Sequence, residues 1–451
     1  MPYLFLCVLF VLTGCAAELS QSASGSLSTQ SSVSYESSQS CKGCHSDIYL
    51  QYEDSEHSKA FVNPVFKAQY FKDIVPRAER DPAFVAEARK CIYCHAPVVY
   101  MNITGLIRTE QQVAHLETGV TCDFCHTLSG YAPNGDYQQN PSRKKLGPFE
   151  KESWHSEYSG FISMSEFCGP CHNSTNHAGV DVKATFDEWQ ASAFKEKRIT
   201  CQDCHMNRNG YLKDGVAEFD SGAVAHLRLG WRDLEVGKRE KLYTHTFPGA
   251  HSNSQLTDTM RVEFKRGDLT PGGDGKLHFG ILVDNSHSGH SMPTGSSDLR
   301  LLWLEVTAAT PEGKPVPVKL TQTPKRGFER YAITGGTPAD ARVLGAQIRS
   351  GSRVYRALYL DGSGRPSLLS SEAVKKVFDN RLKAGEVRRE EYLLQLPDQY
   401  VGTVDVTATL YYQGAPASFT GRLGVPDFKP VVVTTTTKRM TILSSKSGGT
   451  Q

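Results

Sequence analysis

The chain has 451 residues, enough for two or three domains. Its formal net charge of +2 argues against a nucleic-acid or membrane-surface binder, because such proteins carry a basic excess. Only 39% of the residues are hydrophobic, which is low for so long a chain. Either part of it is unstructured, or something other than side chains helps to fill its core.

The first fifteen residues, MPYLFLCVLFVLTGC, indicate an exported protein. The apolar run is shorter than the roughly 20 residues that span a bilayer, and it is typical of a secretory signal over residues 1–14. The ending LTGC resembles the lipobox of bacterial lipoproteins, in which Cys15 becomes the lipidated first residue. An ordinary cleaved signal or an upstream start is the alternative. With Ala16 next, we expect a lipid anchor in the bacterial cell envelope, on the outer membrane, facing the periplasm or the cell surface.

Residues 15–40 are predicted to be a flexible tether. Eleven of the twenty-one residues from Ser20 to Ser40 are serine, and almost none is apolar. Such a segment cannot offset the entropy of ordering by burying surface. It would hold the anchor about 25 to 30 Å on average from the folded part.

Five copies of the pattern C-x-x-C-H follow, here called boxes 1 to 5. They are CKGCH (Cys41, Cys44, His45), CIYCH (Cys91, Cys94, His95), CDFCH (Cys122, Cys125, His126), CGPCH (Cys168, Cys171, His172) and CQDCH (Cys201, Cys204, His205). Each box offers two thiols for thioether bonds and an imidazole for iron, the attachment pattern of a c-type haem.

Zinc is the alternative for paired cysteines, but zinc gives no reason for a histidine directly after each pair. With 15 histidines in 451 residues, five such coincidences have a probability below about 10⁻⁷. We therefore predict five covalently bound c-type haems, whose ionised propionates would bring the net charge to about −3.

The haem domain is predicted over residues 41–257. At this density the haems form most of the core and lie nearly in contact, with short helices between them. One helix is predicted with Asp81 as its cap, Pro82 in its first turn, and AFVAEARK running into Cys91.

Residues 258–440 are predicted to form an antiparallel β-sandwich-like domain, which makes the fold class α+β and multidomain. Leu277, Phe279, Ile281 and Val283 alternate on one face of KLHFGILV with His278 opposite, and VDVTATLYY repeats the pattern. LRLLWLEVTAATPEGKPVPV predicts two strands around a turn, SSEAVKKVFD predicts a helix, and residues 441–451 are predicted to be disordered.

Each iron bound by a box histidine has a second, distal face, and ten further histidines could supply its ligand. His57 is the strongest candidate, followed by His155 and His115, and then by His245 and His290 in HTFPGAHS and NSHSGHSMPTG; His177 and His251 are weaker. Methionine is a rival ligand, but seven methionines against ten spare histidines favour imidazole.

Box 5 raises a question of its own. His57 lies five residues after Tyr52 in YEDSEH, and the same spacing from Trp189 ends at Phe194, which cannot bind iron. Either a distant histidine such as His290 closes the iron at His205, or this iron is open.

These features resemble the multihaem c-type cytochromes, a superfamily that includes the tetrahaem cytochrome of ammonia oxidisers, pentahaem nitrite reductase and octahaem hydroxylamine oxidoreductase. The resemblance rests on the five boxes and on YEDSEHSKAF, SEFCGPCHNSTN, TFDEWQASAFKEKRITCQDCHM, HTFPGAHS and GHSMPTG, over residues 41–420. It implies distal-ligand roles for His57, His155 and His290. Pentahaem nitrite reductase binds its substrate at a haem whose box ends in lysine, whereas every box here ends in histidine, so that active site is not expected.

Two functions follow from this. The first is an envelope-anchored electron carrier with mostly bis-histidine haems, whose partners are other redox proteins or cytochromes, or extracellular electron acceptors, with no nucleic acid. The second is an oxidoreductase in which one open haem, the one at His205, converts a small nitrogen or sulfur compound. A third reading, in which haems only brace an adhesin, is the weakest. The number of spare histidines and the absence of a lysine box favour the carrier.

Overall fold

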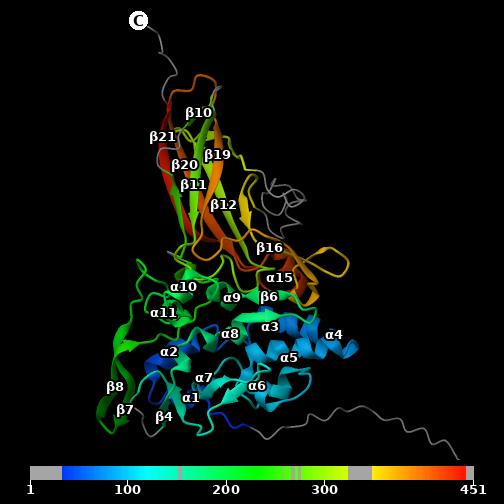
Figure 1. Cartoon of the computed structure of the whole chain (residues 1–451), viewed down its shortest axis with the longest axis vertical. Coiled ribbons are helices and arrows are strands. Elements are labelled where there is room, and N and C mark those ends of the chain that lie inside the picture. The colour runs from blue at the N-terminus through cyan, green and yellow to red at the C-terminus, as the bar shows by residue number, and fades with distance from the viewer. Residues whose placement is uncertain are drawn as a thin grey trace, which may run out of the picture.

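The computed structural model of the chain has a helical end and a β-rich end (Figure 1). It describes residues 33–150, 155–256, 259–265, 270–272, 276–322 and 348–442. The predicted signal, Cys15 and most of the predicted tether and tail lie outside these residues. Within them, no helix is both long and apolar enough to cross a membrane.

Short helices and turns make up most of the haem segment. The helices are α1 (Ser38–Cys41), α2 (Ser46–Glu53), α3 (Pro64–Gln69), the π-turn η1 (Tyr70–Ile74), α4 (Val75–Arg80), α5 (Ala83–His95), α6 (Pro97–Asn102), η2 (Glu110–Val113), α7 (Cys122–Thr127), η3 (Phe161–Ser163), η4 (Ser165–Phe167), α8 (Gly169–His172), α9 (Thr185–Gln190), α10 (Ala193–Glu196), α11 (Cys201–His205) and α12 (Asn253–Leu256). Three small sheets pair β1 (Leu128–Tyr131) with β2 (Tyr137–Gln139), β3 (Lys145–Gly147) with β4 (Ser156–Tyr158), and β5 (Asn173–Thr175) with β6 (Asp181–Ala184).

The helix predicted before box 2 is present as α5, and it ends at His95. The Asp81 carboxylate accepts a hydrogen bond from the Ala83 backbone N–H at 2.9 Å, which satisfies one free donor of the first turn. Thr121 and Thr200 cap α7 and α11 in the same way, each hydroxyl accepting a backbone N–H. Boxes 3 and 5 therefore begin at capped helix N-termini.

A long two-stranded ribbon of β7 (Asp220–Leu229) and β8 (Arg232–Leu242) extends from the helical part (Figure 1). No sequence pattern above predicts it, because most of its side chains are exposed and Trp231 at its tip is 87% exposed. Its inner part contacts box 1: the His226 N–H donates to the Cys44 carbonyl at 2.7 Å. The ribbon thus supports the first box.

The described residues between 261 and 442 form a sandwich of antiparallel sheets. One five-stranded sheet contains β9 (Arg261–Phe264), β10 (Thr270–Gly272), β11 (Lys276–Asp284), β14 (Val318–Leu320) and β19 (Val387–Gln395); the other contains β12 (Leu301–Ala309), β13 (Pro315–Val316), β15 (Arg353–Tyr355), β20 (Gly402–Gln413) and β21 (Val431–Ile442). A three-stranded sheet of β16 (Ala357–Leu360), β17 (Pro366–Ser367) and β18 (Lys375–Asp379), the turn η5 (Ser370–Glu372) and α15 (Ala417–Leu423) complete this part.

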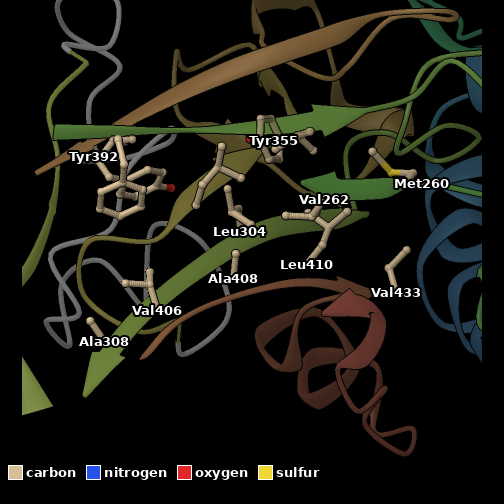
Figure 2. Close-up of a cluster of buried hydrophobic side chains, with 14 of the residues drawn as sticks. Met260, Val262, Leu304, Ala308, Tyr355, Tyr392, Val406, Ala408, Leu410 and Val433 are labelled. Atoms are coloured by element: carbon tan, nitrogen blue, oxygen red, sulfur yellow. The ribbon is translucent and has the colours of Figure 1, made fainter. Parts of the chain in front are cut away.

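The predicted alternation in β11 and β20 is confirmed. The apolar positions from Leu277 to Val283 are buried, His278 is exposed, and the apolar positions from Val404 to Tyr412 are at most 1% exposed. Figure 2 shows the core that they share between the sheets, where side chains such as Leu304 and Leu410 lie. The two strands around a turn are confirmed as β12 and β13.

The helix predicted at SSEAVKKVFD is wrong. Only Ser370–Glu372 form a short 3-10 turn, and β18 follows. Strand β18 pairs with β16, and Phe378 is buried against Leu358. Tertiary pairing of a segment that contains β-branched Val377 therefore outweighs the helical spacing of its apolar residues.

The two parts of the molecule meet through apolar and charged contacts. Ala68 of α3 packs with Leu299, Leu369 and Phe419 from the β-rich part. Beside them, Arg77 of α4 forms an ion pair with Glu372. This contact fixes the β-rich part against the haem segment.

Candidate haem-binding sites

The boxes present their ligands from short helical turns. A helix places residues three and four positions apart on the same face, so the two thiols and the imidazole of one box lie on the same side of their helical turn. All ten box cysteines are partly exposed, and none of them is in a disulfide. Among the described residues, no three His, Cys, Asp or Glu side chains cluster as a zinc site would need.

Four box histidines face a second histidine from elsewhere in the chain. The ring centroids lie 6.3 Å apart for His45 and His155, for His126 and His245, and for His205 and His290, and 6.4 Å apart for His172 and His57. An iron midway between two imidazoles, about 2 Å from each nitrogen, would separate the ring centroids by about 6.3 Å. These four pairs therefore fit an iron between their rings.

Hydrogen bonds at Nδ1 orient the imidazoles. The Nδ1 atoms of His45, His95 and His126 lie 2.7 to 2.8 Å from the backbone oxygens of Val224, Ala60 and Leu146. An Nδ1–H that donates to a carbonyl fixes the tautomer and leaves the Nε2 lone pair for a metal. His245 and His290 make the same kind of contact, at 3.1 Å, to the oxygens of Tyr243 and Ser291.

Burial keeps these imidazoles in the neutral form that binds iron. Burial lowers the pKa to about 4 for His57, His172, His205 and His245. The pKa of His126, His155 and His290 is also lowered, again mainly by burial. Neutral rings at physiological pH need no deprotonation before they coordinate a metal.

The structure separates the predicted distal candidates into two groups. His57, His155, His245 and His290 each face a box histidine, as described above. His115 is exposed, His177 packs its ring on Phe84 at 4.6 Å, and His251 is 43% exposed and pairs with Glu56 at 3.5 Å. None of these last three faces a box histidine in the described part of the chain, so they are not placed to share its iron.

The histidine that faces His205 comes from the β-rich part. His290 follows β11, and its ring is nearly parallel to that of His205, at 8°. Phe194 is instead a buried apolar residue beside Trp189. A Cβ at Gly289 would lie 3.2 Å from Trp189, so the missing side chain lets the loop of His290 come close. Of the two alternatives for the iron at His205, this placement favours a distant histidine, His290, on its distal face.

A buried charge cluster holds the same loop. Glu188 of α9 accepts hydrogen bonds from the Ser291 N–H at 3.1 Å and the Thr294 hydroxyl at 2.8 Å. Its other carboxylate oxygen lies 2.8 Å from Arg381, without hydrogen-bond alignment, and Arg381 also binds Asp379. Glu188 of the haem segment thus holds the loop that carries His290 in place through hydrogen bonds.

Box 2 differs from the other four. Phe66 of α3 stacks on the His95 ring, with centroids 4.0 Å apart and planes 12° apart, and no imidazole faces His95 among the described residues. Burial lowers the pKa of His95 to about 3, and the positive charge of Lys183 adds to this effect. No sequence pattern pointed to Phe66 or Lys183, because both lie far from box 2 along the chain.

Cysteine contacts show which boxes are neighbours. Cysteines of different boxes lie close to one another: Cys41 beside Cys122, Cys94 beside Cys171, and Cys168 beside Cys201, which link boxes 1 and 3, 2 and 4, and 4 and 5. Boxes 3 and 4 are linked by Phe247, whose ring lies 4.3 Å from His57 and 6.4 Å from His245. All five boxes therefore form one connected cluster.

Comparison with known proteins agrees with this arrangement. Residues 40–127 match the family model of cytochrome c554 and c-prime. The crystal structure of a penta-heme cytochrome c552 from Thermochromatium tepidum has 20% sequence identity and a TM-score of 0.61, over 90% of this chain and 99% of that chain. The chain therefore has the fold of a multihaem c-type cytochrome.

Two other comparisons carry no argument. A family 123 glycoside hydrolase from Clostridium perfringens matches with a TM-score of 0.17 and 6% identity, over 42% of this chain and 28% of that chain. Among curated protein sequences, none matches this one.

Proposed function

We propose that this chain, whose fold is that of a multihaem c-type cytochrome, is a five-haem electron carrier of the bacterial cell envelope. The observation that carries the proposal is the set of four facing histidine pairs at 6.3 to 6.4 Å. Bound haem would supply one-electron chemistry at its iron. Imidazoles fixed on both faces by burial and hydrogen bonds keep the coordination unchanged when an electron moves, and this favours fast transfer.

The connected boxes support a continuous route for electrons. Because the box cysteines attach the porphyrin edges, thiols in contact would bring two haem edges together. The contacts described above give the order 1, 3, 4, with haems 2 and 5 both next to haem 4. A carrier with this layout accepts an electron at one end of the cluster and releases it at another.

The envelope location and the partners rest on the sequence. The export signal and the lipobox at Cys15 support an anchor on the outer membrane, and a tethered carrier would exchange electrons with other redox proteins. Radioactive palmitate incorporated by the expressed full-length chain, and lost in Cys15→Ala, would support the anchor. Labelling of neither chain would refute it.

The competing function is an oxidoreductase with one open iron. The observation that favours it is now at box 2, because no imidazole faces His95 among the described residues. An enzyme would need a sixth position that a substrate can occupy there.

The carrier proposal is tested by removing the facing histidines one at a time. Pyridine haemochrome analysis of the purified protein should give five haems per chain. His57→Ala, His155→Ala, His245→Ala and His290→Ala should each let one additional haem bind carbon monoxide in the reduced protein. His115→Ala is the matched control and should add none. If the four variants bind no more carbon monoxide than the control, the facing pairs do not hold iron.

A further inference from the structure

The strand β6 places Lys183 on the side of the haem segment. Neighbouring side chains on a strand point to opposite faces. Val182 is buried against Ala357 and Tyr359 of the β-rich part. Lys183, the next residue, therefore points away from that part and toward the boxes.

The charge of Lys183 acts on every group of box 2. After burial, it is the largest cause that lowers the pKa of His95, and it also lowers the pKa of Cys91 and Cys94. Strand β6 pairs with β5, where Lys183 lies opposite Ser174, and the neighbouring Thr175 carbonyl accepts a hydrogen bond from Lys90, the residue before Cys91. Lys183 therefore lies beside box 2, and its charge also reaches His172 of box 4. That is the environment of the haem whose distal face lacks a histidine.

Two polar groups at this place have no partner. The described residues offer the Lys183 ammonium no ion pair and no hydrogen bond, although the side chain is half-buried. Asp298 is 3% exposed, its Oδ1 accepts no hydrogen bond from any described residue, and the Lys183 charge lies near enough to lower its pKa, which burial raises to about 6. An unpaired buried polar atom such as the Asp298 oxygen is costly, so a group bound here is expected to satisfy it.

We propose that the Lys183 amine is the sixth ligand of the haem attached at Cys91 and Cys94. A deprotonated lysine amine has a lone pair for iron, and binding removes a half-buried charge that forms no ion pair with any described residue. The N–H groups that the amine keeps would donate to the Asp298 carboxylate. This deepens the proposed function and rests on it, because it leaves a cytochrome with four bis-histidine haems and one histidine–lysine haem.

The test compares variants at Lys183 in the full-length holoprotein. Lys183→Leu removes the amine, and Lys183→Arg replaces it with a guanidinium, which stays charged and does not bind iron. Lys90→Leu is the matched control, because Lys90 precedes Cys91 and donates to the Thr175 backbone oxygen at 2.8 Å. Haem content and the bis-imidazole EPR signals show that each variant has folded.

We expect the reduced wild type and Lys90→Leu to bind no carbon monoxide, and both Lys183 variants to bind one per chain. Near-infrared magnetic circular dichroism of the oxidised wild type gives a second measurement, which should resolve one amine–imidazole haem beside four bis-imidazole haems. One carbon monoxide per wild-type chain would overturn the lysine ligand but keep the four pairs. Two or more would overturn the four pairs themselves.

Discussion

The loop that carries His290 should loosen when Glu188 is replaced by glutamine. Glu188 and Arg381 are 13% and 7% exposed at their side chains, and the carboxylate holds the loop through Ser291 and Thr294. Breaking a buried ion pair costs about 3 to 5 kcal/mol when one charge is left alone. Arg381 keeps two bonds to Asp379, at 2.9 and 2.8 Å, so the cost is lower.

The expected cost follows from the bonds that remain. Hydrogen bonds to a charged group contribute about 1.5 to 3 kcal/mol, and a glutamine oxygen keeps part of this as a neutral acceptor. We therefore expect Glu188→Gln to destabilise the closed loop by about 2 kcal/mol, and Glu188→Ala to destabilise it by more.

Carbon monoxide uptake at low urea concentrations measures this opening. When the loop opens, His290 leaves the iron at His205 and carbon monoxide binds there, so the urea midpoint of uptake reports the free energy of opening. Glu386→Gln is the control, because Glu386 pairs with Arg388 at 2.7 Å in the β-rich part, with its side chain 28% exposed, and does not touch the His290 loop. If Glu188→Gln shifts the midpoint no further than Glu386→Gln, the cluster does not hold His290 and the reasoning is wrong.

Three further predictions concern stability. Burial would raise the pKa of Glu372, but its hydrogen bonds and ion pairs, above all with Arg77, outweigh this and hold the pKa below the ordinary 4.5. A carboxylate with a depressed pKa stabilises the fold above pH 4.5, and this stabilisation is lost as the pH falls further. Denaturant titrations should therefore show a loss of stability below pH 4.5 that is smaller in Glu372→Gln. Phe66→Ala should destabilise the haem segment by about 3 kcal/mol and broaden the EPR signal of the haem at His95, whereas unchanged unfolding would contradict the stacking. Thr200→Ala removes a helix cap, and calorimetry should show a loss of about 1 kcal/mol, with Thr200→Ser close to wild type.

The sequence alone determined the local features of this protein. The five boxes depend on spacing within five residues, and a helical turn is enough to bring their thiols and imidazole together. The helix before box 2 was predictable because its cap at Asp81 and its apolar spacing are local, and β11 and β20 were predictable because strict alternation follows from burial of one face. His57 and His155 could be named as candidates because each lies near a box along the chain.

Only the tertiary structure decided which histidine faces which box. His290 faces His205 across 85 positions of the chain. The glycine at 289 matters only in the folded chain, because a Cβ there would crowd Trp189 and Phe194. The strand at Lys375–Asp379 likewise depends on a partner strand that its own residues do not specify. The surroundings of box 2 also depend on the tertiary structure, because the Phe66 ring and the Lys183 charge come close to His95 only in the folded chain. Contacts between distant segments depend on the packing of the whole chain, and no local pattern contains that information.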